Sequence, residues 1–485
     1  MKVSEINFGD IDANDESLRY PQIFADYFLN DKEFVEELTS KFKFLVLGRK
    51  GTGKTALGRF IEVKSKKDPT TFVKFLSFKQ FPFNDMFDME NKSEASPNQY
   101  KSAWNWVILT QLGLSLIENQ NLINDENVIK LSKFFENNYG TLKIDSKKII
   151  EDTKKRKFTV SAKEILSYEN EKSHKQESGK YYEYIDDLES TIKNVNTTDC
   201  ECRHFLIFDE LDEAFRLSRK KYNDTLISLI KVANELNNSF YALGRPYKIM
   251  VLLRSDIFKT LNDTDLNKIK HGSAIELDWY QDVRKPEESR LVNLINLRIN
   301  KSLGLNKEVN SWVKIFPVNI YDDKTSFKFV LEKTRHIPRD IVQYCKECQK
   351  LAKDDTKFSK AAVLSAEKKY SEYFRDEIRN ELKGYYSDEK IDQLFLVLAR
   401  VGNENFTIVD FSKALADFDE LKNEDSKKLL TLMFEHNMVE NVSVRKGKTF
   451  FESAYRNESL SANFDYAFCI HKGLRKVLNL RYIGQ

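Results

Sequence analysis

The amino-acid sequence predicts an α/β protein whose core is a three-layer αβα sandwich. Three short apolar runs support this prediction: residues 44–47 lead into a glycine-rich loop, 205–208 end in acidic residues, and 248–253 end in a polar cluster. Continuous apolar runs of this kind are typical of strands buried on both faces of a parallel sheet. We therefore expect the polar residues that follow the strands to meet at the carboxyl-terminal edge of the sheet.

The glycine-rich loop has the spacing G-x-x-x-x-G-K-T, which is typical of a phosphate-binding loop (P-loop). Its glycines allow backbone N–H groups to face a triphosphate, and the helix that begins near Lys54 directs its positive end towards the same point. We expect Lys54 to contact the β- and γ-phosphates and the Thr55 hydroxyl to bind Mg²⁺. The sequence therefore predicts the core of a P-loop NTPase. The residues predicted to bind ATP are Gly48, Arg49, Lys50, Gly51, Thr52, Gly53, Lys54, Thr55 and Ala56.

The second apolar run ends in the carboxylates that a nucleotide hydrolase needs. Asp209 stands at the predicted strand end, where it would be the second Mg²⁺ ligand, and Glu210 is the candidate base for the attacking water. The alternative is that the acidic run only begins a solvated helix. That interpretation fits Asp212 and Glu213, which lie farther from the strand.

Two arginines are candidate sensors of the nucleotide. Arg254 follows the third strand and could contact the γ-phosphate, whereas Ser255 or Asp256 could cap the next helix. Arg339 lies in the segment TRHIPRD (334–340), where it could reach the γ-phosphate from a small helical lid. A surface salt bridge is the alternative for Arg339.

The order of P-loop, acidic strand, sensor strand and lid arginine resembles that of AAA+ and STAND ATPases, particularly their origin-recognition-like members. More closely, the segments at 8–16, 47–57, 252–258, 276–279 and 337–340 resemble a family of uncharacterised bacterial P-loop ATPases. The resemblance implies ATP binding and hydrolysis, and by analogy a homo-oligomer. Relatives occur in anti-phage defence settings, which makes defence one expected role.

An insertion lies between the first two functional strands, because 155 positions separate Lys54 from Asp209. Residues 122–196 are rich in Lys, Glu, Asp and Asn, which predicts charged helices that project from the core. They are either a partner-binding module or a solvated elaboration. The predicted domains are a lead-in segment at 1–40, an ATPase core at 41–325 with this insertion, a helical lid at 326–380 and a winged-helix domain at 381–485.

The winged helix is predicted from three helical stretches followed by a β-hairpin. Residues 442–485 carry 8 basic and 3 acidic side chains, and Arg445, Lys446 and Lys448 at the hairpin turn could bind a DNA backbone. However, the helix expected to enter the major groove contains Glu424, Asp425 and Glu435, which phosphates would repel. The alternative is a winged helix that packs against the ATPase or a protein partner.

Composition and hydropathy limit the cellular location and the kinds of partner that we expect for the protein. No apolar stretch approaches the roughly 20 residues of a membrane helix, and the first residues lack an apolar signal core, so we expect no membrane contact and a cytoplasmic location. The net charge of +3 neither demands nor excludes nucleic acid. We expect the five cysteines to be reduced thiols, with Cys345 and Cys348 one turn apart on a helix.

Two functions follow as hypotheses. In the first, the protein is an ATP-binding and ATP-hydrolysing switch that acts on or senses DNA, with anti-phage defence as one expected role. In the second, it is a STAND-type regulator whose nucleotide state controls the binding of an effector protein, with slow or no turnover. ATP and Mg²⁺ are the expected ligands in both.

Overall fold

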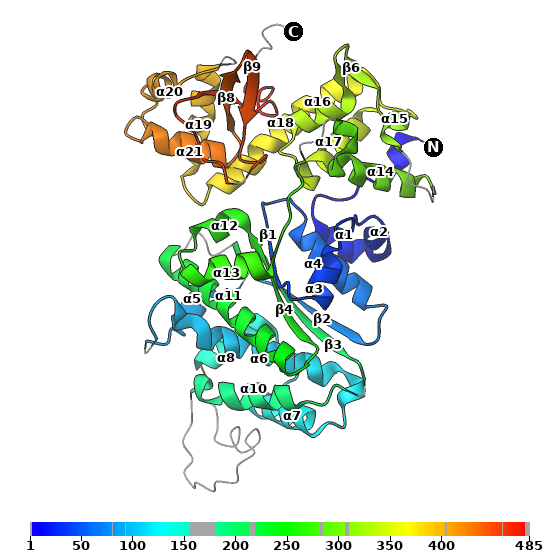
Figure 1. The fold of residues 1–485 in the computed structure, drawn as a ribbon, viewed down its shortest axis with the longest axis vertical. Coiled ribbons are helices and arrows are strands. Elements are labelled where there is room, and N and C mark those ends of the chain that lie inside the picture. The colour runs from blue at the N-terminus through cyan, green and yellow to red at the C-terminus, as the bar shows by residue number, and fades with distance from the viewer. Residues whose placement is uncertain are drawn as a thin grey trace. The chain divides into compact units, whose positions relative to one another are not determined.

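The computed structural model divides the chain into two compact units. The core unit comprises Ala13–Leu277, and the C-terminal unit comprises Met1–Asp12 together with Asp278–Gln485. Each unit has its own strands and helices (Figure 1) and is described separately. The structure describes residues 2–79, 81–92, 94–155, 180–198, 200–212, 219–281, 285–305, 310–402, 405–457 and 459–480.

The core unit is built on a five-stranded parallel sheet with the order β2-β3-β4-β1-β5. The register pairs Gly48 with Arg254 and Ser77 with Asp209, so the carboxyl ends of β1, β4, β2 and β3 lie along one edge. This arrangement confirms the predicted parallel sheet. The strands are β1 (Leu45–Gly48), β2 (Thr71–Ser77), β3 (Arg203–Asp209), β4 (Tyr247–Arg254) and β5 (Ala274–Glu276).

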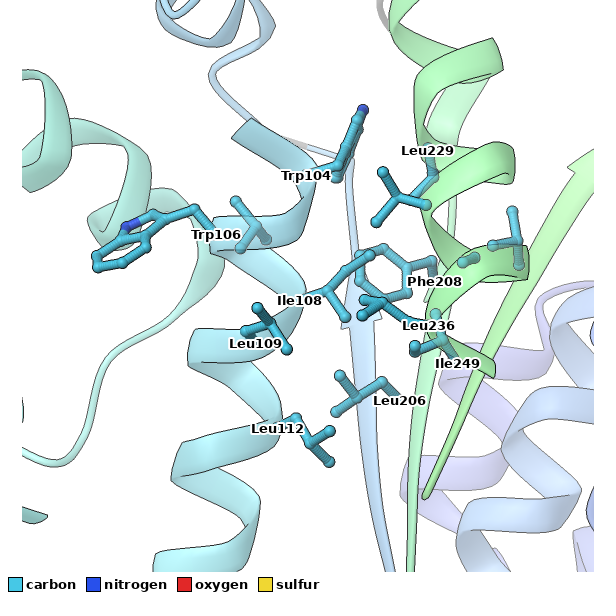
Figure 2. Packing of buried hydrophobic residues seen from close by; sticks show 14 of the residues in the cluster. Trp104, Trp106, Ile108, Leu109, Leu112, Leu206, Phe208, Leu229, Leu236 and Ile249 are labelled. Carbon is cyan, nitrogen blue, oxygen red and sulfur yellow. The ribbon is translucent and has the colours of Figure 1, made fainter. Parts of the chain in front are cut away.

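Helices cover both faces of this sheet and complete the three layers. In β3, Leu206 and Phe208 pack on one face and Phe205 and Ile207 on the other, because successive side chains of a strand alternate. Figure 2 shows α6 and α11 against Leu206 and Phe208 on the first face. One face carries α6 (Lys101–Glu118), α11 (Arg219–Ala242) and α13 (Thr264–Ser273); the other carries α3 (Phe34–Ser40) and α4 (Lys54–Ser65), with α1 (Ala13–Arg19) and α2 (Pro21–Asp26) packed on α4.

The insertion between β2 and β3 is helical, as predicted, but its described helices do not project from the core. They pack on α6, and their apolar residues join the same hydrophobic cluster as the sheet. Phe134 and Ile192 are fully buried in this cluster. The apolar spacing along 122–196 is thin, yet it suffices to bury one stripe of each amphipathic helix. The helices that pack on α6 are α7 (Glu126–Tyr139), α8 (Ser146–Lys155) and α10 (Ile185–Asn194), and α5 (Phe83–Phe87), which precedes α6, packs on α8. Residues 156–179 lie outside the described part of the chain.

The C-terminal unit contains a helical region followed by three helices and an antiparallel sheet. The sheet has the order β10-β8-β9, and its hairpin follows the last helix, in the order expected for a winged helix. The winged-helix assignment itself stays a prediction. The elements are α14 (Arg290–Ser302), α15 (Trp312–Ile315), β6 (Asn319–Tyr321), β7 (Lys324–Thr325), α16 (Ser326–Lys333), α17 (Pro338–Leu351), α18 (Lys360–Leu382), α19 (Asp388–Val401), α20 (Ile408–Leu415), α21 (Ser426–Glu435), β8 (Val439–Arg445), β9 (Lys448–Glu452) and β10 (Ala467–Ile470).

The boundaries of the two units differ from the predicted domain boundaries. Apolar residues of α14, such as Ile295, pack with α17 and α18, so the core ends at Leu277 and not near 325. The predicted lead-in segment 1–40 is also divided. Val3 and Phe8 are buried in the C-terminal unit, while the segment from Ala13 belongs to the core.

The expectation that the cysteines are reduced thiols is met at Cys345 and Cys348 and not at Cys200 and Cys202. Cys345 and Cys348 are buried thiols on α17. Cys200 and Cys202 form a disulfide before β3, whereas we expected thiols. Among the described residues there is no cluster of three potential metal-ligating His, Cys, Asp or Glu side chains, and no described helix has the length and apolarity to cross a membrane.

Candidate nucleotide-binding site

The P-loop lies between the end of β1 and the first turn of α4, and all nine residues predicted to bind ATP are in it. Gly53 has φ 97°, in the left-handed region that side chains other than glycine rarely adopt. Gly48 has no space for a side chain, because a Cβ atom would lie 2.5 Å from Thr52 Oγ1. The loop therefore needs glycine at both positions to place its backbone around a ligand.

Lys54 is buried inside the curve of the loop. Its Nζ donates hydrogen bonds to the carbonyl oxygens of Gly48, at 2.8 Å, and Arg49, at 2.9 Å. Burial lowers the pKa of Lys54 to about 8, although the nearby Asp209 carboxylate opposes this shift. A buried ammonium group at this position would gain strongly from a phosphate.

Thr55 and Asp209 come together from α4 and the end of β3. Thr55 Oγ1 donates a hydrogen bond of 2.7 Å to Asp209 Oδ2. Burial raises the pKa of Asp209 to about 6, and the hydrogen bond from Thr55 opposes the rise. A buried carboxylate beside a hydroxyl oxygen fits the hard oxygen ligands that Mg²⁺ prefers, so these two residues could hold the ion.

Glu210 follows β3 in an uncommon backbone conformation, with φ 59°. Its carboxylate accepts a hydrogen bond from Asn14 Nδ2 at 3.2 Å and another from the Ser77 hydroxyl. Ser77 is the last residue of β2 and pairs in register with Asp209. The candidate base is therefore held by groups from α1 and β2.

Asn14 is held in turn by α4. Arg59 Nε donates to Asn14 Oδ1 at 2.7 Å, Arg59 also pairs with Glu62 at 2.7 Å, and its guanidinium lies 3.7 Å from the ring centre of Phe75. Sequence reasoning assigned no role to Asn14, Ser77 or Arg59. Asn14 lies in the segment 8–16, whose resemblance to other ATPases could have drawn attention to it. Nothing in the sequence connects Ser77 with Glu210.

Arg254 ends β4 opposite Gly48, the first residue of the P-loop. Its guanidinium forms two hydrogen bonds with Asp256, at 3.1 and 2.6 Å, and one with Asp212 at 3.1 Å. Ser255 and Asp256 lie inside α12 (Ser255–Thr260), so neither caps this helix. The register thus places Arg254 beside the P-loop, in contact with two carboxylates.

Arg339 belongs to the C-terminal unit, where it lies in the first turn of α17. It pairs with Glu377 of α18 at 3.4 Å, and its side chain is 25% exposed. This is the salt bridge that we considered as an alternative. The role of Arg339 as a nucleotide sensor stays a prediction.

Comparison with known protein families identifies one part of the C-terminal unit. Residues 289–379 match the family model of the FunZ-associated C-terminal helical domain. The match begins just before α14 and ends within α18. It therefore starts earlier than the lid predicted at 326–380 and ends at nearly the same residue. None of the curated proteins matches the chain.

Solved structures similar to this chain include an Orc1 protein, a Cdc6p protein and a RuvB protein. The Orc1 protein of Aeropyrum pernix in complex with DNA shares 10% identity over 96% of this chain and 95% of that one, with a TM-score of 0.38. Cdc6p of Pyrobaculum aerophilum shares 13% identity over 90% and 89%, with a TM-score of 0.32. The RuvB Holliday junction branch migration motor of Thermotoga maritima shares 10% identity over 95% and 100%, with a TM-score of 0.32.

The predicted resemblance to origin-recognition-like proteins agrees with these similarities, but their TM-scores are too low to support an argument. The assignment is based instead on the parallel sheet, on the G-x-x-x-x-G-K-T loop between β1 and α4, and on the family match. Together these observations show that the chain has the α/β fold of a P-loop NTPase core and that residues 289–379 are similar to the FunZ-associated C-terminal helical domain.

Proposed function

We propose that the protein binds ATP with Mg²⁺ and hydrolyses it as a molecular switch that acts on or senses DNA. The observation that supports this proposal best is the juxtaposition of Lys54, Thr55 and Asp209 at the carboxyl-terminal edge of the sheet. Lys54 would contact the phosphates, and Thr55 with Asp209 would hold Mg²⁺. When bound, the ion would neutralise charge on the phosphate oxygens.

Glu210 would orient the attacking water and accept its proton. Each carboxylate oxygen of Glu210 accepts one hydrogen bond, from Asn14 or Ser77, and these bonds fix the orientation of the side chain and lower its basicity. The remaining lone pairs can still accept a hydrogen bond from the attacking water. Arg254 would exchange a contact with Asp212 or Asp256 for one with the γ-phosphate. The site therefore favours slow turnover that a ligand or partner accelerates.

The proposed DNA contact is the turn of the β8–β9 hairpin. Lys446 and Lys448 are exposed at this turn. Arg445 pairs with Glu452 at 2.8 Å and with the Tyr466 hydroxyl at 3.0 Å, which orients its guanidinium but offsets part of its charge. Of the three basic residues, the two lysines offer the more accessible charge for phosphates.

The second candidate is a regulator of the STAND type, whose nucleotide state controls an effector protein. The contacts of Glu210 with Asn14 and Ser77 favour this candidate, because they hold the base away from a free orientation. A homo-oligomer and a role in anti-phage defence are compatible with both candidates. They are part of the proposal by family resemblance.

ATP hydrolysis by the full-length protein separates the two candidates. We would compare the wild type with Glu210→Gln, each with double-stranded DNA, single-stranded DNA and no DNA, and use the exposed Glu118→Gln as a matched control. Turnover that DNA raises and Glu210→Gln abolishes supports the DNA-linked ATPase. Tight ATP binding with negligible turnover, indifferent to DNA, favours the regulator. Absence of ATP binding in the wild type contradicts both.

A further inference from the structure

A second pocket lies in the core unit at the edge of the sheet opposite the P-loop. It has a volume of about 140 Å³ and is formed where β1, β3 and β4 begin. Lys248 and Arg203 lie near the starts of the strands that end in Arg254 and Asp209. The pocket therefore lies at the amino-terminal ends of the strands, and the P-loop lies at their carboxyl-terminal ends.

The pocket is lined by cationic side chains and no described acidic one. The cations are Lys41, Arg203, Arg245 and Lys248. Arg203 pairs with Asp68 outside the lining, at 3.2 Å. The remaining three have no ion pair with a described carboxylate that would offset their charge within the pocket.

Lys248 carries the strongest indication that an anion belongs here. Its ammonium donates a hydrogen bond to the carbonyl of Lys41, and burial alone lowers the pKa of Lys248 to about 8. Arg245 donates to the carbonyl of Val195 at 3.0 Å, while its buried Nε has no hydrogen-bond partner among the described atoms. Lys248 and Arg245 are half-buried. A cationic group that loses part of its water without gaining a counter-charge is destabilised, and an anionic ligand would offset part of that cost.

The mouth of the pocket carries an exposed aromatic pair. Phe42 and Tyr241 have ring centres 4.5 Å apart and are 59% and 66% exposed. Large aromatic side chains that are exposed side by side often mark a binding surface. Asn234 and Asn238 add amide groups to the same lining, which can pair with the polar edge of a planar ring.

We propose that this pocket binds a nucleoside monophosphate, with the phosphate on Lys248 and Arg245 and the base on Phe42 and Tyr241. The volume is smaller than the roughly 300 Å³ at which pockets for whole drug-sized ligands begin. The phosphate therefore enters the pocket and the ring stays at the mouth, against the exposed aromatic side chains. Cations, aromatic faces and amides together match the phosphate, the ring face and the ring edge of such a ligand.

Binding to the full-length protein tests this assignment independently of ATP hydrolysis. We would titrate AMP, GMP, CMP and UMP by calorimetry into a Lys54→Ala background without Mg²⁺, so that the P-loop contributes little. We expect at least one of these nucleotides to bind, and Lys248→Met to weaken its binding at least tenfold. The exposed Lys268→Met on α13 is the matched control and should bind as the background does.

Tyr241→Ala keeps the test decisive even where Lys248→Met fails to fold, because Tyr241 is on the surface. Loss of one base–aromatic contact should weaken binding about tenfold. No binding of any of the four nucleotides at millimolar concentration overturns the proposal, as does binding that neither substitution changes. Inorganic phosphate that binds as tightly as the nucleotides, with no effect of Tyr241→Ala, overturns the nucleotide assignment.

Discussion

Glu210 shows how single residues decide the behaviour of the site. The P-loop residues and Asp209 create a place for a charged ligand, but the candidate base beside them is already hydrogen-bonded to Asn14 and Ser77. The left-handed backbone conformation of Glu210 sets the direction in which its side chain leaves the main chain. At this scale, the proposed activity would depend on these neighbours as well as on Glu210 itself.

Asn14→Ala should raise the basal rate of ATP hydrolysis several-fold. The substitution removes a hydrogen bond to a charged acceptor, a contact worth about 1.5–3 kcal/mol, and so frees Glu210 for water. Steady-state turnover and ATP affinity would be measured together, with the exposed Asn267→Ala as control. A lower rate at unchanged affinity would show instead that Asn14 positions Glu210 for catalysis.

Thr55→Ala should weaken Mg²⁺-dependent ATP binding at least tenfold. The substitution removes one of the two oxygen groups proposed to hold the ion and leaves Asp209 without its 2.7 Å hydrogen bond. Nucleotide affinity would be measured with Mg²⁺ and with EDTA. The difference between these conditions should shrink in Thr55→Ala and persist in the exposed Thr264→Ala. An equal Mg²⁺ effect in both variants would remove Thr55 from the metal site.

Elements are joined by buried polar residues as well as by apolar packing. His204 of β3 lies between Ser115 of α6 and Asn119, the residue directly after α6, at 2.9 and 3.3 Å. It also stacks on Phe72 of β2 with ring centres 4.8 Å apart. Burial lowers the pKa of His204 to about 3. The imidazole is therefore neutral in the folded protein over the range in which an unfolded chain would protonate it.

The core unit should lose stability as the pH falls below about 6.5, the ordinary pKa of histidine. Between that pH and about 3, the unfolded chain takes up a proton that folded His204 excludes, so each pH unit costs up to about 1.4 kcal/mol. Melting temperatures at pH 7.5 and 5.5 would measure this loss. The loss should be smaller in His204→Gln than in wild type or in the exposed His271→Gln. Equal losses in all three would contradict the assignment.

The segment TRHIPRD joins α17 to α18 through a buried ion-pair network. Arg335 forms two hydrogen bonds with Asp340 through its side chain, at 3.0 and 2.9 Å, and pairs with Glu381 at 3.0 Å. Arg335 is only 4% exposed. The neighbouring Arg339 has a single, partly exposed partner in Glu377.

Arg335→Met should destabilise the C-terminal unit by about 3–5 kcal/mol, because it leaves buried carboxylates without their partner. Arg339→Met should change stability by less than about 1 kcal/mol, since its ion pair is partly exposed. Urea unfolding, monitored by hydrogen exchange of the amides in α17 and α18, would measure the stability change of each variant. Equal losses would mean that the two arginines support the fold alike. An effect of Arg339→Met on ATP response alone would support its proposed sensor role.

The whole molecule consists of two units, and one of them is built from two separate segments of the chain. Residues 2–12 belong with α14 to α18, so the chain starts in the C-terminal unit before it builds the core unit. Gln349 of α17 donates hydrogen bonds to the carbonyls of Val3 and Ile6, at 2.7 and 2.8 Å. Phe8 is buried beside Phe358 with ring centres 6.3 Å apart.

Phe8→Ala should destabilise the C-terminal unit by about 3–5 kcal/mol, as is usual when a buried aromatic ring is removed. Hydrogen exchange would locate the loss, which should appear in α14, α17 and α18 but not in the sheet of the core unit. Leu18→Ala, at a position 66% exposed, is the control and should change little. Faster exchange confined to the core unit would contradict the assignment of this segment.

The sequence predicted those parts of the site that directly follow an apolar strand. The P-loop, Asp209 and Glu210 follow apolar strands, and this local pattern also predicted the parallel sheet that the structure confirms. The sequence did not predict that the helices of 122–196 pack on α6. Their apolar residues are few and widely spaced, and they line up on one side of the helix only when the segment is helical. It also placed the end of the core near 325 and not at Leu277, since helical patterns do not show which cluster they join.

By itself, therefore, the sequence determined the class of fold and the place of the predicted phosphate-binding loop, because strand, loop and helix signals act over a few neighbouring residues. Only the tertiary structure decided what surrounds the predicted site. Asn14 and Ser77 reach Glu210 from positions 196 and 133 residues away. Lys41, Arg245 and Lys248 likewise form one pocket only after three strands lie side by side. Such contacts depend on the pairing of distant segments, which no local pattern of residues specifies.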